Sequence, residues 1–315
     1  MDWQPGISVN YLKARAKLLG QIRGFFAQRE VMEVETPLLM GAPVTDPWLQ
    51  ALSVKNHRLA AAPDVMWLQT SPEYAMKRLL AAGSGAIYQI CKAFRDDESG
   101  RKHNHEFTML EWYRPDFSLV QLMDETDQLL QLTLNCQSAE RVSYQQLFID
   151  QLSIDPLTAT TQQLQRAALV TGMQGPDDLD VDGWLQLLMG CVIEPKLGHD
   201  RPLIVYGFPP SQSALAKVEN GVASRFEVYC KGVELANAYH ELTDAIEQRS
   251  RAEQDLVKRS ELGLPMVPID EKLLAAVEAG LPDCSGIALG VDRLLMLVTD
   301  EADLRKLISF DASRI

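Results

Sequence analysis

The segment from Ile87 to Pro115 places the strongest constraint on what this chain can fold into. It reads IYQICKAFRDDESGRKHNHEFTMLEWYRP, with an apolar arm on each side of a highly charged centre. Apolar runs of this length, bounded by polar turn-forming residues, are typical of strands. The pattern predicts two strands joined by a long polar loop. A solvated surface hairpin would have the same charged loop, so the segment alone leaves its role open.

The ends of this hairpin carry side chains that suit a nucleotide. Arg95 ends the first arm, and Asn104 and Phe107 open the second. The planar guanidinium of arginine can hold phosphate or carboxylate oxygens in a bidentate manner. A cation, an amide and an aromatic ring at fixed spacing are what the α-phosphate and adenine of ATP require. We interpret His103 and His105 as hydrogen-bonding loop residues and not as a catalytic pair.

Composition and charge exclude several classes of protein. The chain has 315 residues, of which 46% are hydrophobic and 23% charged, as in soluble globular proteins of one or two domains. It lacks an apolar run of the roughly 18–20 residues that a membrane span needs, and its N-terminus lacks the plan of a signal peptide. We therefore expect a cytoplasmic location. Five scattered cysteines predict reduced thiols. The net charge of −13 argues against nucleic-acid binding over the whole surface, although it allows a local basic patch.

Apolar periodicity predicts an α+β fold in which strands are scattered among helices. Residues 140–200 are expected to form a mostly helical insertion with a loop at 172–183. The segment VMEVETPLL, residues 31–39, should begin with a short strand that ends at Pro37. Helices are predicted at 11–28, 74–83, 119–132, 143–149, 161–169, 184–193, 245–262 and 271–279, and further strands at 67–70 and 203–208 and in the segment 225–242.

Ser71, Pro72 and Glu73 open one of these helices. Serine suits the N-cap, proline suits the first helical position, and a glutamate is favoured near the positive end of the helix dipole. Gly83 should end the helix. Taken alone, Glu73 is explained by capping.

Three glutamates recur every seven residues in the segment RFEVYCKGVELANAYHEL: Glu227, Glu234 and Glu241. Lys231 and Gly232 form a plausible turn or bulge, which can redirect side chains that a period of two would separate. Glu227 and Glu234 would then converge on magnesium, which favours one or two carboxylates together with phosphates. Glu241 would hold a cationic group such as a substrate amine. The alternative is three exposed strand glutamates, yet two of them lie in apolar surroundings where an unpaired charge is costly.

The segment GIALGVDRLLML predicts a strand, a glycine turn and a helix. Gly290 at the turn would let a ligand approach the backbone. Arg293 at a helix start is electrostatically unexpected, because cations are favoured at the other end. A bound polyphosphate would supply the missing anion, and a nearby carboxylate is the alternative partner. Neither a GxGxxG nor a Walker A motif is present.

Taken together, these segments resemble the class II aminoacyl-tRNA synthetases. VETPLL is similar to motif 1, FRDDESGRKHNHEFTMLEWY to motif 2 and GIALGVDRLLML to motif 3, in the right order over nearly the whole chain. The resemblance implies a single catalytic domain over residues 1–315, an antiparallel sheet flanked by helices, and a homodimer. TSPEYAMKRLL, HNHEFTMLEWY and GVELANAYHELTDA look most like the lysine enzymes.

The resemblance is strongest to a branch of the lysine enzymes that acts on a protein. Few residues precede the first predicted helix, so the anticodon-binding domain is not expected. Ala288 stands where the lysine synthetases have glycine, and its methyl group would reshape the amino-acid pocket towards a β-amino acid. This branch transfers (R)-β-lysine to a lysine side chain of translation elongation factor P, with no tRNA as partner. Two alternatives stay open: a truncated lysyl-tRNA synthetase that charges tRNA, and an inactive synthetase-like domain that binds or regulates.

Site roles follow from the resemblance, with ATP as substrate and Mg²⁺ as cofactor. Arg95 and Arg293 would be catalytic, and adenine would stack between Phe107 and Arg293. Asp97 replaces the usual glutamate and His105 the usual proline, so the shorter Asp97 would make its contact through water or lose it. The ATP set is Arg95, Asp96, Asp97, Asn104, Phe107, Glu234, Leu235, Gly290 and Arg293. The substrate set is Ser71, Pro72, Glu73, Tyr113, Asn237, Glu241 and Ala288, and the metal set is Glu227 and Glu234.

Overall fold

The computed structural model describes residues 3–57, 63–96, 100–176 and 178–315. The chain divides into two compact units: Met1–Asp116 with Leu242–Ile315, and Phe117–Glu241. Each unit has a mainly antiparallel sheet flanked by helices, which confirms the predicted α+β class. The single catalytic domain expected over residues 1–315 stays a prediction.

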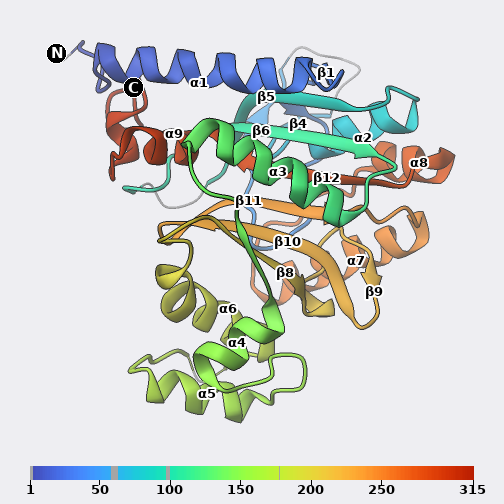
Figure 1. The fold of residues 1–315 in the computed structure, drawn as a ribbon. Coiled ribbons are helices and arrows are strands. Elements are labelled where there is room, and N and C mark those ends of the chain that lie inside the picture. The colour runs from blue at the N-terminus through green and yellow to red at the C-terminus, as the bar shows by residue number, and fades with distance from the viewer. Residues whose placement is uncertain (1–2, 58–62, 97–99, 177) are drawn as a thin grey trace. The chain divides into compact units, whose positions relative to one another are not determined.

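The sheet of the first unit is built on the predicted hairpin (Figure 1). Strands β5 (Ile87–Phe94) and β6 (Glu106–Pro115) pair antiparallel along their whole length, as expected. β12 (Cys284–Gly290) pairs antiparallel with the other edge of β6, and β1 (Met32–Glu33) pairs parallel with β5. The polar loop therefore leaves from the same end of the sheet at which β12 reaches its final glycine, because Gly290 lies opposite Met109.

Helices cover both faces of this sheet. Phe26 of α1 (Val9–Ala27) stacks on Tyr88 of β5, with ring centroids 4.4 Å apart, and meets Trp112 of β6 edge-on. Ile87 and Tyr113, each next to one of these strand residues, pack instead into a buried cluster with α2 (Glu73–Ala81) and α8 (Glu271–Gly280). Successive strand residues face opposite sides, so α1 lies on one face and the α2–α8 pair on the other. The other described helices of the unit are α7 (Ala245–Glu261), α9 (Val291–Thr299) and the short η4 (Leu304–Lys306).

The short strand predicted to end at Pro37 is present, but it covers only the two residues of β1. The structure has two short strands there, β1 and β2 (Leu39–Met40), with Pro37 between them. Proline has no N–H and restricts the residue before it, so a continuous ladder cannot pass. β2 joins a second, small sheet with β4 (Val65–Leu68) and β3 (Ser53–Lys55).

The second unit combines a sheet with several helices. β10 (Val222–Cys230) pairs antiparallel with β11 (Val233–His240), β8 (Leu203–Phe208) and β9 (Val218–Glu219), while β7 (Glu140–Ser143) pairs parallel with β8. The helices are α3 (Leu119–Leu134), α4 (Tyr144–Leu152), α5 (Thr161–Val170) and α6 (Val181–Leu188), and the shorter turns are η1 (Met189–Ile193), η2 (Glu194–Lys196) and η3 (Pro210–Gln212).

Side-chain caps explain where these helices start. The side chains of Ser118, Ser143 and Thr160 each accept a backbone N–H of the first turn of α3, α4 and α5. α6 begins at Val181, two residues before the predicted loop ends, because the Asp180 side chain caps it. No helix of the described ranges is both long and apolar enough to cross a membrane.

Candidate active site

The end of the hairpin places a cation against an aromatic ring. Phe107 lies opposite Ala93 in the β5–β6 ladder, and the Arg95 guanidinium lies 5.2 Å from the centroid of the Phe107 ring. The Arg95 N–H donates to the His105 carbonyl oxygen at 3.0 Å, so pairing continues one step past the strand ends. The pair predicted to bind ATP is therefore held by the sheet itself.

The loop between the two strands reaches the start of α9. Nη2 of Arg293 lies 2.7 Å from Nε2 of His103, so the predicted adenine-stacking arginine lies at the hairpin loop. Both ends of the Asn104 amide are engaged within the chain: Nδ2 donates to the Glu106 carbonyl at 2.7 Å, and Oδ1 accepts the Ala312 N–H at 3.4 Å. The amide has a second N–H and a second lone pair on its oxygen, so contact with ATP does not require the loss of either bond.

The two aspartates of the loop are only partly described. The Asp96 N–H donates to the carbonyl oxygen of Gln50 at 2.9 Å, which ties the base of the loop to the segment before β3. Asp97, the predicted adenine contact that departs from the family pattern, lies outside the described residues.

A buried carboxylate that sequence reasoning missed lies among the predicted amino-acid residues. Glu111 of β6 is only 2% exposed, and it accepts hydrogen bonds from Ser71 Oγ at 2.6 Å and Tyr113 Oη at 2.7 Å. Ala288 lies directly opposite Glu111 in the β6–β12 ladder. Opposite residues of an antiparallel pair share a face, so the Ala288 methyl group stands beside the carboxylate. The sequence feature that could have identified Glu111 is its position as a single glutamate inside the apolar run FTMLEWY.

The start of α2 contributes a second carboxylate. The predicted start of the helix is one residue too early, because Pro72 and not Ser71 stands at the N-cap and Glu73 is the first helical residue. The Ser71 side chain still accepts a hydrogen bond from the first turn, since its Oγ accepts the Glu73 N–H at 3.0 Å. The Glu73 carboxylate accepts from Nζ of Lys77 at 2.6 Å, and Lys77 is fully buried. Glu73 is therefore more than a cap, since it also neutralises a buried ammonium group.

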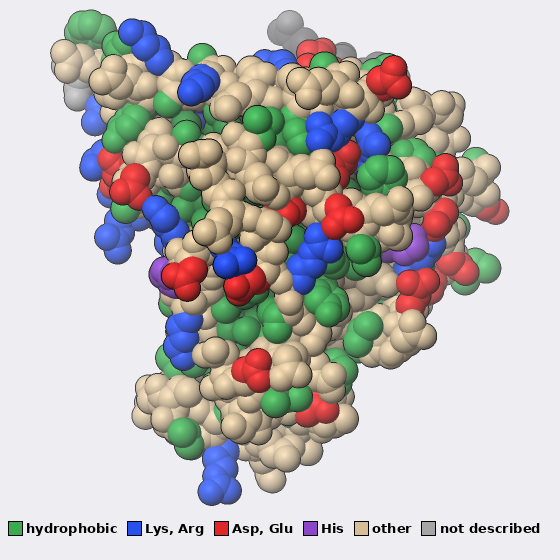
Figure 2. Space-filling model, in the orientation of Figure 1, with side chains coloured by type: hydrophobic (Ala, Val, Ile, Leu, Met, Phe, Trp, Pro, Cys, Tyr) green, Lys and Arg blue, Asp and Glu red, His purple; other side chains and the backbone are tan. Residues whose placement is uncertain are grey.

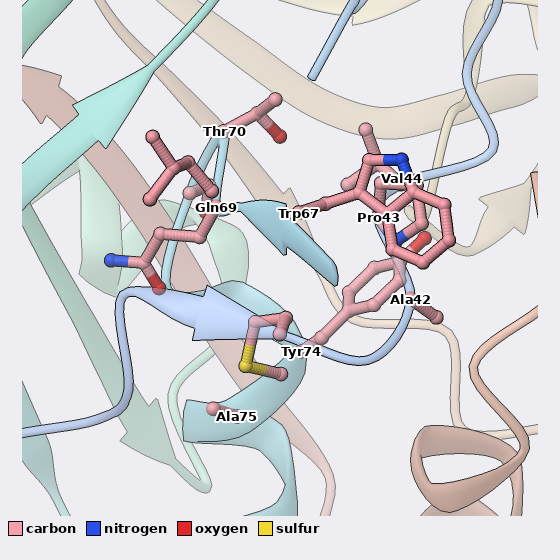
Figure 3. Close-up of a pocket in the computed structure, with 11 residues that line it drawn as sticks. Ala42, Pro43, Val44, Trp67, Gln69, Thr70, Tyr74 and Ala75 are labelled. Carbon is pink, nitrogen blue, oxygen red and sulfur yellow. The ribbon is translucent and has the colours of Figure 1, made fainter. Parts of the chain in front are cut away.

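A small pocket borders Ser71 (Figure 3). Trp67 and Pro43 gather on one side of it and Gln69 lies on the other, with about 290 Å³ of empty space that includes open solvent. Gln69 Oε1 and Thr70 Oγ1 are buried and have no hydrogen-bond partner among the described residues. Buried polar atoms are usually satisfied, so a substrate group or an ordered water would fit here.

In the second unit, an arginine that the sequence did not single out organises two predicted site residues. Arg225 donates from Nη2 to Glu227 and from Nε to Asn237 Oδ1 at 3.1 Å, and its guanidinium lies 4.5 Å from the Phe208 ring centroid. The Tyr229 hydroxyl donates to the other Glu227 oxygen. Arg225 therefore fixes both Glu227 and Asn237 on one face of the β10–β11 pair.

The predicted turn between the glutamates is present. Lys231 and Gly232 have φ of 50° and 67°, and the ladder shifts register between Val228 and Tyr229. Burial raises the pKa of the Glu227 carboxyl above its usual value. The positive charge of Arg225 lowers this pKa, and the negative charge of Glu234 raises it further. A divalent cation would relieve the repulsion between the two carboxylates, so the pair fits a metal. The described residues hold no cluster of three or more acidic, histidine or cysteine side chains for an all-protein cage, which leaves the remaining ligands to phosphates and water.

The end of β11 carries the last predicted residues. Glu241 is 1% exposed and forms an isolated antiparallel bridge with Ala216. Leu235 is 2% exposed, so a contact between Leu235 and a nucleotide would run through its backbone. The exposed-glutamate alternative is therefore wrong for Glu227 and Glu241, which are both buried.

Comparison with known proteins defines the class to which this fold and these motifs belong. The sequence profile of the family described as tRNA synthetases class II (D, K and N) matches residues 2–314, so the chain belongs to that family. Within it, a relative from Edwardsiella ictaluri (strain 93-146) is 52% identical over 99% of this chain and 98% of its own length, and it is named elongation factor P–(R)-β-lysine ligase. A relative with the same name from Pectobacterium carotovorum subsp. carotovorum (strain PC1) is 51% identical over 99% of this chain and 98% of its own length. Another from Histophilus somni (strain 2336) is 49% identical over 98% of this chain and 97% of its own length.

Proposed function

We propose that this chain activates (R)-β-lysine with ATP and transfers it to a lysine side chain of translation elongation factor P. The observation that carries the proposal is Glu111, a buried carboxylate held by two hydroxyl donors and facing Ala288. A buried carboxylate with this environment suits an ammonium group. The shared name of relatives at about half identity supports the acceptor.

The first chemical step is adenylate formation. A carboxylate oxygen of β-lysine attacks the α-phosphorus of ATP, and the bond to the β-phosphate oxygen breaks to release pyrophosphate. Such a transfer depends on positioning and on stabilisation of the charge that develops. Arg95 would face the α-phosphate and the substrate carboxylate, and Arg293 would cover adenine opposite Phe107. The acceptor amine then attacks the acyl carbon, AMP leaves, and the amine loses a proton.

The substrate carries two ammonium groups, and the chain offers several carboxylates for them. Glu111, with Tyr113 and Glu241, would take the distal ammonium, and Glu73 would take the one nearer the carboxylate. Asn237, held by Arg225, would lie near the substrate carboxylate. Because Lys77 already offsets the charge of Glu73, Glu73 should bind its amine more weakly than Glu111 does.

We assign magnesium to Glu227 and Glu234. Bound there with the phosphates of ATP, the ion would neutralise charge on the leaving pyrophosphate. Arg225 and Tyr229 would keep the Glu227 carboxylate in one orientation through their hydrogen bonds to its two oxygens.

The proposal includes a cytoplasmic homodimer that does not use tRNA. On the face shown in Figure 2, the described lysine and arginine side chains are scattered among acidic ones. Binding a polyanion usually needs clustered basic residues, and the net charge of −13 points the same way.

The test compares acceptors and amino acids with one purified protein. We expect exchange of pyrophosphate into ATP that depends on (R)-β-lysine, and transfer of the β-lysyl group to elongation factor P measured by intact mass. Substantial charging of tRNA with α-lysine would contradict the assigned acceptor. Absence of exchange with every lysine isomer would instead favour the inactive, binding domain.

A further inference from the structure

Three residues from distant parts of the sequence form a closed hydrogen-bonded ring in the first unit. Arg15 of α1 donates from Nη1 to Asp292 Oδ1 and from Nη2 to Thr108 Oγ1, both at 2.5 Å. The other oxygen of Asp292 accepts the backbone N–H of Thr108 at 2.6 Å. The ring therefore joins α1, the start of β6 and the first turn of α9.

The ring is largely sheltered from water. Asp292 is 4% exposed and Thr108 is 6% exposed, and the Arg15 side chain is 20% exposed. Buried ion pairs contribute little net stability compared with apolar residues of the same size, because desolvation offsets the attraction. A fully bonded polar network does restrict its surroundings to one arrangement. Orientation of neighbouring groups is therefore a better reason for this ring than stability.

Those neighbouring groups are the residues assigned to ATP. Thr108 directly follows Phe107, and Asp292 directly precedes Arg293. The bond from the Thr108 N–H to Asp292 fixes the peptide after Phe107 relative to the helical turn that carries Arg293. The planar guanidinium of Arg15 donates one hydrogen bond to Asp292 and one to Thr108, so it links the two residues.

We infer that Asp292 and Arg15 are positioning residues for the nucleotide, which set the gap between the Phe107 ring and the Arg293 guanidinium. The inference rests on the proposed ATP site. Its consequence is that α1, which contributes no residue to the nucleotide set, controls ATP affinity through Arg15. Loss of the ring should weaken ATP binding without changing recognition of β-lysine, because none of the three ring residues belongs to the set assigned to the amino acid.

The test uses Arg15→Gln and, as a matched control, Arg23→Gln. Arg23 lies on the same helix and forms an ion pair with Glu33 at 3.1 Å, but this pair is exposed and does not contact the residues assigned to ATP. In β-lysine-dependent pyrophosphate exchange, Arg15→Gln should raise KM for ATP by about 10- to 100-fold, the effect of losing hydrogen bonds to a charged group. KM for β-lysine should stay unchanged, and Arg23→Gln should match the wild type in both constants.

Two further variants guard against a merely structural effect. Thr108→Val keeps the shape and the backbone N–H and removes one acceptor of Arg15, so it should raise KM for ATP less than Arg15→Gln does. The double variant should equal Arg15→Gln alone, because both changes break one ring. Arg15→Lys keeps the charge but not the fork, and it should lie between Arg15→Gln and the wild type. If Arg15→Gln fails to fold, Thr108→Val and Arg15→Lys still give the ATP-specific rise in KM or its absence.

The inference is overturned if Arg15→Gln behaves like Arg23→Gln, or if KM for ATP and for β-lysine rise together. Calorimetric titration with ATP tests the positioning role of Arg15 and Asp292 separately from the proposed reaction, because it measures ATP binding without catalysis. A wild-type protein that binds ATP but performs no exchange would defeat the proposed reaction, while the difference in ATP affinity between Arg15→Gln and Arg23→Gln would still decide the role of the ring. A wild-type protein that does not bind ATP would overturn both.

Discussion

Glu111→Gln is the substitution that most directly separates binding of the substrate amine from stability of the fold. The change keeps the size of the side chain and removes a charge that is only 2% exposed. Glutamine retains one carbonyl oxygen for one hydroxyl donor, and its NH₂ group can donate to the other hydroxyl. Ser71 and Tyr113, which now donate at 2.6 and 2.7 Å, would both keep a partner.

The expected effects on binding and on folding differ in sign. A hydrogen bond to a charged group contributes about 1.5–3 kcal/mol, so loss of the carboxylate should raise KM for β-lysine about 10- to 100-fold. Burial takes the Glu111 charge out of water, which is costly, so the free energy of unfolding should stay the same or rise by about 1 kcal/mol when that charge is removed. Pyrophosphate exchange measures the first quantity and urea unfolding the second.

Glu33→Gln is the matched control, because Glu33 also accepts from a tyrosine hydroxyl, that of Tyr88 at 2.9 Å, but on β1 and away from the assigned residues. It should leave KM for β-lysine unchanged. The reasoning fails if Glu111→Gln keeps the wild-type KM, or if it lowers stability while KM for ATP and for β-lysine rise equally.

Three other predictions concern separate parts of the chain. Glu241→Ala should abolish use of the amino acid in pyrophosphate exchange while calorimetry still detects ATP binding, and unchanged kinetics would refute the role of Glu241. Burial raises the pKa of Asp255 from 3.8 to about 6, so the native carboxyl holds its proton more tightly than the unfolded one and stability falls as the pH rises through this window. Asp255→Asn should therefore raise the free energy of unfolding by about 1–2 kcal/mol above pH 6, a value reduced for the partial exposure of the side chain. Below pH 3.8 the substitution should give no gain. Equal gains at the two pH values in urea unfolding would contradict this reasoning. Gly198 has φ of +67°, and an added Cβ would overlap the Tyr229 carbonyl. Gly198→Ala should therefore lower the free energy of unfolding by about 3 kcal/mol or more in urea unfolding. Gly190→Ala is the control, because a Cβ at Gly190 meets open space, and it should not destabilise the protein.

Much of the local structure could be predicted from the order of residues. The β5–β6 hairpin, the capping of α2 by Ser71 and the turn at Lys231–Gly232 depend on residues close together in the chain. Pro37 was correctly predicted to end a strand, but that strand covers only Met32–Glu33. Local rules succeed where the interacting groups are near neighbours, whereas the length of a strand also depends on the distant strand that pairs with it.

The candidate site divides in the same way. Arg95 and Phe107 flank the loop of one hairpin, so the sequence alone placed both of them at one end of it, while the contact between the two side chains came from the structure. Glu111 and Arg225 were missed, because a charge in a strand reveals its purpose only through partners on other segments. Ser71 is 40 positions from Glu111, and Arg225 reaches Asn237 across the β10–β11 pair.

The sequence by itself determined the family, the three motifs and the residue types that ATP and a diamine require, because these are written in local order and composition. Only the tertiary structure decided that Glu111 is buried opposite Ala288 and that Arg15 closes a ring with Asp292 from 277 positions away. Strand register and helix packing bring such groups together. Both arise from burial of apolar faces across the whole chain, which no short stretch of sequence specifies.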